Sequence, residues 1–149
     1  MNFIKNLLPA LAGSLALNAI HEIARRKSDN VPKINKIAEE GIEKIWEATG
    51  NDAPTGNKRY RIALTGDIVA NTAYFTAIKG RTNTETWVKG LVLGAVAGFG
   101  ALKLTAPIGL NDQPVNRNPT VQALTILYYA AGGLVTAAVF NSLRKYRKK

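Results

Sequence analysis

The stretch NPTVQALTILYYAAGGLVTAAVFNSL, residues 118–143, decides the fold class, because it contains no charged side chain over 26 positions. A helix of about 20 apolar residues crosses a hydrocarbon core of roughly 30 Å. The alternative is a buried central helix of a soluble protein, but a soluble chain of 149 residues rarely contains so long an uncharged run. The stretch therefore predicts a membrane-spanning helix and an integral membrane protein.

Three further apolar blocks lie upstream of this stretch, and Lys and Arg residues gather near the ends of the blocks. We predict one integral membrane domain over residues 1–149, with spans at about residues 3–23, 62–78, 87–106 and 120–143. The first block has the position of a signal peptide, but no small-residue cleavage site follows it, so we expect an uncleaved span. The chain is therefore predicted to be an all-α, polytopic helical membrane bundle, in a membrane that the sequence does not identify.

Residues 33–48 form a segment of a different kind between the first and second spans. Apolar side chains recur there at helical spacing, charged side chains fill the other face, and Trp46 lies near the end of the segment. This pattern is typical of an amphipathic helix that lies in the membrane interface. An ordinary helix that caps the bundle is the alternative.

The block at residues 62–78 decides between four spans and three, because it is only 17 residues long and contains Asp67. Three spans would place both large basic clusters on the cytoplasmic side, as the preference of Lys and Arg requires. Four spans would bring Glu22, Asp67 and Lys103 to one level near one end of the bundle. Because an isolated charge at the bilayer centre costs on the order of 3 kcal/mol, we favour four spans and leave the orientation open.

The polar residues of the spans form the candidate site: Asn18, His21, Glu22, Asp67, Asn71 and Lys103. Ionisable residues inside a membrane commonly belong to ion pathways, proton relays or ligand sites. The structural alternative is that these residues pair with one another and fix how the helices pack. Since His21 and Glu22 are adjacent, they point about 100° apart around a helix, and we expect one of them to face the bundle centre. We predict no metal site and no cofactor.

Glycine residues recur at intervals of four in the third span and occur as a pair in the fourth: Gly90, Gly94, Gly98, Gly132 and Gly133. In lipid, helices associate through close packing, and glycine at this spacing lets two backbones approach each other. We therefore predict that these glycines form helix-packing surfaces.

The charge and the missing motifs narrow the function. The chain has 20 Lys and Arg residues against 10 Asp and Glu residues, and no Cys. The basic residues lie at the ends of apolar blocks, where they meet anionic lipid headgroups, so we expect a lipid bilayer and no nucleic acid as partner. The zinc-protease helix, the nucleophile elbow and the glycine-rich phosphate loop are all missing, and we expect no enzyme.

The function that we expect is that of a small non-catalytic membrane protein, an accessory, assembly or interaction subunit that packs through its glycine-lined helices. Such a chain would form a homo-oligomer or belong to a larger membrane complex. The alternative is a small oligomeric transporter or channel, coupled to ions or protons through the polar cluster.

Overall fold

The computed structural model describes residues 2–146, and the side chains of residues 5–145. Its described part is all-helical, as predicted, and contains no strand. In chain order the elements are α1 (Asn2–Lys27), α2 (Ile34–Ala48), α3 (Gly56–Phe75), the 3-10 turn η1 (Thr76–Ile78), α4 (Asn83–Leu104), α5 (Gln113–Asn116) and α6 (Pro119–Tyr146).

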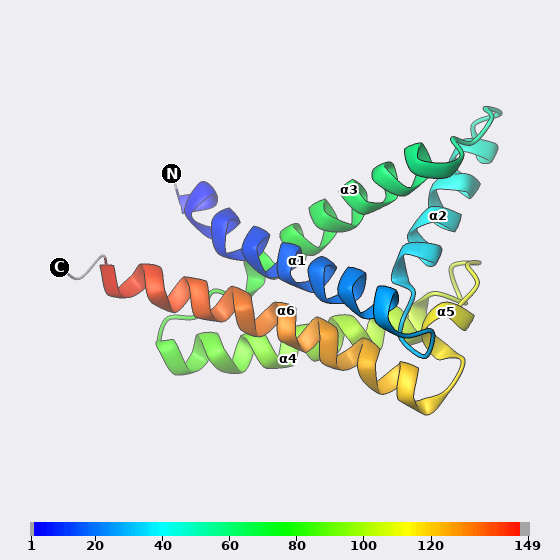
Figure 1. Cartoon of the computed structure of the whole chain (residues 1–149). Coiled ribbons are helices and arrows are strands. Elements are labelled where there is room, and N and C mark those ends of the chain that lie inside the picture. The colour runs from blue at the N-terminus through cyan, green and yellow to red at the C-terminus, as the bar shows by residue number, and fades with distance from the viewer. Residues whose placement is uncertain (1, 147–149) are drawn as a thin grey trace.

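Three of these helices are long and apolar enough to cross a membrane, over Lys5–Lys27 in α1, Asn83–Leu104 in α4 and Pro119–Lys145 in α6. They lie side by side, with α6 packed against both α1 and α4 (Figure 1). The second predicted span, at residues 62–78, coincides with most of α3 and with η1, but this segment is not among the three helices that are apolar enough.

Helix α4 begins at Asn83, four residues before the predicted span, because the residues ahead of the apolar block form a helix cap. The Thr82 hydroxyl accepts a hydrogen bond from the Glu85 backbone N–H over 3.1 Å, and the Glu85 carboxylate accepts one from the Arg81 N–H over 2.7 Å. The first bond satisfies a backbone donor that the first turn of the helix leaves without a partner, and the second ties the residue before the cap to that turn.

Helix α3 leaves the layer formed by α1, α4 and α6. It packs along α1 and α2, and it barely contacts α4. It starts near the end of the molecule where α1 finishes and carries the chain back toward the end where α4 begins (Figure 1). Both described chain ends therefore lie at the same end of the bundle.

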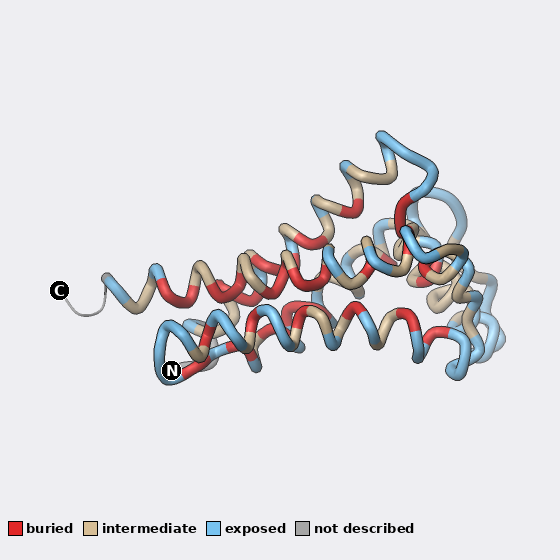
Figure 2. Tube along the Cα trace, turned by 90° about the horizontal axis from the view of Figure 1, so that it is seen from below, coloured by how far each residue is buried: buried red, intermediate tan, exposed pale blue. Residues whose placement is uncertain are grey.

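The core is formed by the sides of the helices that face one another, and most outward faces are exposed (Figure 2). Its main cluster contains Ala10, Leu17, Phe75, Ile78, Tyr129, Ala137 and Phe140. On the outer side of α4, Val88, Val92 and Val96 are more than half exposed. Such a row of branched apolar side chains suits contact with lipid tails.

Candidate functional site

Four of the six predicted polar residues line one small cavity between α1, α2 and α3: Asn18, His21, Glu22 and Asp67. Water can occupy about 30 Å³ of this cavity. Since one water molecule needs roughly 10–15 Å³ by this measure, the cavity has room for about two. Arg25, Asn35 and Tyr60 complete the polar part of its lining.

The Glu22 carboxylate is fully engaged. Its Oε2 accepts hydrogen bonds from Arg25 Nε over 2.6 Å and from the Tyr60 hydroxyl over 3.0 Å. Its Oε1 accepts from Arg25 Nη2 and Arg26 Nε, both over 2.8 Å. Because the charge is compensated and every favourable direction is occupied, Glu22 joins α1 to α3 and is not free to act as a base.

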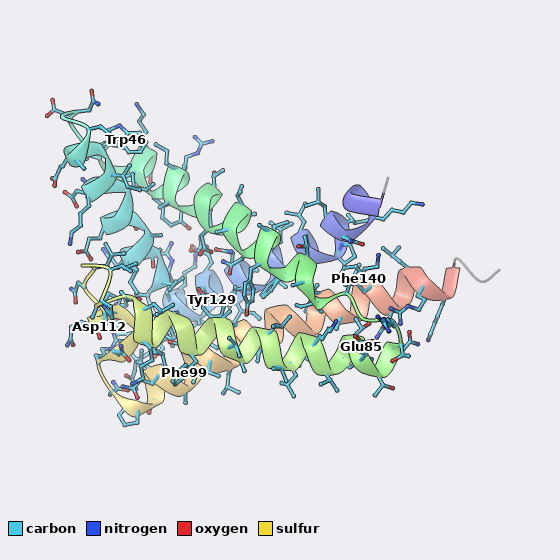
Figure 3. All side chains as sticks on the ribbon, turned by 180° about the vertical axis from the view of Figure 1, so that it is seen from behind. Trp46, Glu85, Phe99, Asp112, Tyr129 and Phe140 are labelled. Carbon is cyan, nitrogen blue, oxygen red and sulfur yellow. The ribbon has the colours of Figure 1, made fainter. Side chains whose placement is uncertain are left out.

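His21 is the least satisfied residue of the cavity. It is 5% exposed, and neither ring nitrogen has a hydrogen-bond partner among the described residues. The Pro32 carbonyl approaches the ring, but outside hydrogen-bond geometry. Tyr128 and Tyr129 present their rings edge-on to the imidazole, with centroids 5.2 and 6.0 Å away. Tyr129 itself belongs to the core between the helices (Figure 3).

Asp67 lines the same cavity as His21, and it forms no ion pair with any described residue. The side-chain amides of Asn18 and Asn71 lie beside its carboxylate. Each amide is held in place by a 3.0 Å hydrogen bond to a backbone carbonyl of its own helix, that of Ser14 or of Asp67. Asp67 is therefore stabilised by amide dipoles and has no cation beside it.

The structure does not bring Lys103 to this cavity. Its side chain is exposed, and its Nζ lies 5.9 Å from the centre of the Phe99 ring on the outer side of α4 (Figure 3). The reason is the orientation of α4: the line of glycines that ends at Gly98 faces α6 and continues to buried Leu102. Lys103 points about 100° away from that line.

Two residues of this region were not among the predicted site residues. Tyr60 supplies the contact from α3 to Glu22, and it lies seven residues before Asp67, on the same face of a helix. The Ser14 hydroxyl donates a 3.0 Å hydrogen bond to the Ile68 carbonyl, which also joins α1 to α3. The seven-residue spacing of Tyr60 and Asp67 is a signal in the sequence that could have revealed the first of them.

The three predicted packing glycines of α4 lie against α6 of the same chain. A Cβ added at Gly90 would lie 2.7 Å from the Gly133 carbonyl oxygen, and one added at Gly94 would lie 2.6 Å from the Tyr129 carbonyl oxygen. At Gly98 the nearest atom would be Ile126 Cα, at 2.6 Å. Side chains do not fit at such distances, so these glycines bring the two backbones together.

Gly132, which precedes Gly133 in α6, allows α6 to pack closely against α1. A Cβ at Gly132 would lie 3.0 Å from Leu17 Cβ and 3.1 Å from the Gly13 carbonyl oxygen, both in α1. Gly13 was not among the predicted packing residues, although a Cβ there would clash with Gly132 and Thr136. Helix α6 thus packs closely on α4 through Gly133 and on α1 through Gly132.

The chemistry available to the cavity is limited. Among the described residues, no three His, Asp or Glu side chains are grouped so that they could hold a metal ion. What remains is a buried imidazole and an unpaired carboxylate that line a cavity with room for about two waters, a set that could exchange a proton. Comparison of the chain with protein-family models, with curated proteins and with solved structures gave no match.

Proposed function

We propose that this protein is a small non-catalytic integral membrane protein that assembles with another membrane helix, either of a second copy or of a larger complex. One observation carries the proposal: on the outward face of α3 the residues Gly66, Ala70 and Ala73, with Ala77 of η1, are small and exposed, and Val69 among them is 62% exposed. A Cβ at Gly66 would meet no atom within 4 Å. In lipid, such a face lets a neighbouring helix approach closely.

The proposed assembly surface on α3 differs from the glycine surfaces of α4 and α6 that the sequence predicts for helix packing. The glycines of α4 and α6 already pack against helices of their own chain, so they are not available to a partner. Helix α3 is free on its outer side because it leans away from α4. It is also the least apolar of the four long helices, so a partner helix would cover it better than lipid does.

The polar cavity supports a structural role for the cluster. Glu22 is held by Arg25, Arg26 and Tyr60, and the remaining space holds about two waters. A substrate larger than water would not be enclosed in this cavity. The contacts made by Glu22 and Ser14 instead fix α3 against α1.

The proposed topology has four spans, with α2 in the membrane interface. The apolar segment of α3 and η1, residues 62–78, has a length of about 26 Å, which is close to the thickness of the hydrocarbon core. It also carries the chain back from the end of the molecule where α1 finishes, at a wide angle to α1, and this return supports a crossing (Figure 1). The exposed Ile45 near the end of α2 suits an interfacial position.

The natural absence of Cys makes the topology directly testable. With four spans, Asn51→Cys and Lys79→Cys lie on opposite sides of the membrane, so an impermeant maleimide labels only one of them in closed vesicles. With a re-entrant α3, both sites lie on the same side and label alike. Permeabilised vesicles, in which both must react, are the control.

The assembly surface is tested by adding bulk to α3. We expect the double variant Ala70→Leu/Ala73→Leu to shift the protein from an oligomer, or from a complex, to the free chain in mild detergent, as measured by native mass spectrometry. Val92→Phe adds similar bulk to the lipid-facing side of α4 and should leave assembly unchanged. Undiminished assembly of the α3 variant would contradict the proposal.

One observation favours the alternative, a proton-coupled transporter: His21 is buried without a hydrogen-bond partner among the described residues, and it lines, together with Asp67, a cavity that has room for water. In that case Asp67→Asn would abolish a proton flux in vesicles while the α3 variants left the flux intact. If flux is absent from the wild type as well, the alternative is excluded.

A further inference from the structure

A second group of charged residues lies at the opposite end of the bundle, where α4 begins and α6 ends. An open groove of about 370 Å³ is lined there by Arg81, Thr82, Asn83, Arg144 and Lys145, and we call it the terminal basic groove. Glu85, at the start of α4, marks this end of the molecule in Figure 3. Three cationic side chains from two separate segments of the chain therefore meet around one opening.

The central cation of the groove is held in a fixed position. Arg144 donates hydrogen bonds from Nη1 to Asn83 Oδ1 over 2.9 Å, and from Nη2 to the Gly80 carbonyl over 2.7 Å and to Thr86 Oγ1 over 3.2 Å. None of these acceptors is an acid, so the guanidinium keeps its full charge. Because its side chain is already ordered, binding of an anion would cost little further conformational entropy.

The positive charge of the groove is not cancelled by nearby acids. Among residues 79–90 and 140–145 the one acid is Glu85. Its carboxylate is already occupied by Lys89 Nζ at 2.9 Å and by the Arg81 backbone N–H at 2.7 Å. Arg81 and Lys145 are both exposed, and neither side chain forms an ion pair with a described residue.

The depth of the groove indicates which anion it meets. The apolar helix of α4 begins at Asn83, and that of α6 ends at Lys145, so the groove lies at the level where hydrocarbon gives way to headgroups. Arginine forms paired hydrogen bonds with phosphate oxygens, and lysine adds a point charge. A phosphate attached to a lipid is delivered to this level by the membrane itself.

We propose that the terminal basic groove binds the phosphate of an anionic phospholipid headgroup, with Arg144 as the fixed donor and Arg81 and Lys145 closing over the charge. This site is separate from the α3 surface and from the polar cavity, so the lipid-binding proposal can be tested independently of the proposed assembly function.

The test uses the full chain in a neutral detergent, titrated separately with phosphatidylglycerol, with phosphatidylcholine and with inorganic phosphate, and bound lipid is counted by native mass spectrometry. The variant is Arg81→Gln/Lys145→Gln, which leaves the bonded Arg144 in place. The matched control is Lys58→Gln/Arg61→Gln, which removes the same charge from two exposed positions at the other end of the molecule.

We expect wild type to prefer phosphatidylglycerol over phosphatidylcholine. Each exposed ion pair with the phosphate contributes up to about fivefold, so the groove variant, which removes two of them, should lose roughly 25-fold of that preference. The control variant should keep it. A groove variant that retains the preference, or a control that loses as much, would overturn the proposal. Displacement of the lipid by millimolar inorganic phosphate would show a free-phosphate site and refute the assignment to a headgroup.

Discussion

The substitution Gly94→Ala tests the packing of α4 on α6 most directly. The added Cβ would lie 2.6 Å from the Tyr129 carbonyl oxygen and 2.8 Å from Ala130 Cα, whereas ordinary contacts begin at 3.4 Å. Both neighbours are backbone atoms, so relief requires the helices to separate by about 0.8 Å. A gap of that size forfeits roughly a quarter to a half of the dispersion energy at the contact, and overpacking of this kind typically costs about 1–3 kcal/mol.

The assay is reversible unfolding by SDS in mixed micelles, followed by circular dichroism. Gly100→Ala is the matched control, because the same change in the same helix would meet only the Leu104 side chain, at 3.7 Å. We expect Gly94→Ala to lower the free energy of unfolding by about 2 kcal/mol and the control to be neutral within about 0.5 kcal/mol. Equal stability of the two variants would refute the close approach of α4 to α6.

Two further predictions concern polar contacts. Glu22→Gln should lower the free energy of unfolding by about 1–2 kcal/mol, since it removes the charge that binds Arg25 and weakens the bond to Tyr60; the same SDS titration measures it, and an unchanged midpoint would contradict it. The backbone N–H of Asn111, and Lys44 in addition, lowers the pKa of Glu40 below its ordinary value of 4.5. The stabilisation is therefore fully present above about pH 4.5 and is lost as the pH falls through the lowered pKa. The protection factor of the Asn111 amide, which is its exchange rate relative to the intrinsic rate at the same pH, should therefore fall there in wild type but stay constant in Glu40→Gln.

The helical fold could be predicted from the sequence because the distribution of apolar and charged residues is sufficient to indicate it. A run of 26 residues without charge can form a helix in lipid but has few alternatives, and α6 occupies that run. The predicted start of α4 was wrong because apolar residues alone defined that span. The polar residues Thr82 and Glu85 form a cap that extends the helix upstream of its apolar block.

The residues of the polar cavity could be predicted only in part from the sequence. The position of a residue along a helix is easier to infer than the direction in which its side chain points around the helix. Lys103 lies at a level compatible with Glu22, but the line of glycines in α4 turns Lys103 outward. Extending that line from Gly98 to Leu102 would have shown this. The partners of Glu22 within α1 lie three and four residues away and are visible in the sequence, whereas the contact from Tyr60 depends on how α3 leans.

The backbone contact of α4 with α6 limits which positions of α4 can change during evolution. Two registers of period four run along α4, two residues apart: Gly90, Gly94 and Gly98 on one side, and Val88, Val92 and Val96 on the other. Exchange among valine, leucine and isoleucine alters little in the second register, while even one methyl group is too much in the first. In a saturation mutagenesis scan of α4, we therefore expect the glycine positions to tolerate no larger residue, and the valine positions two residues away to tolerate most apolar residues.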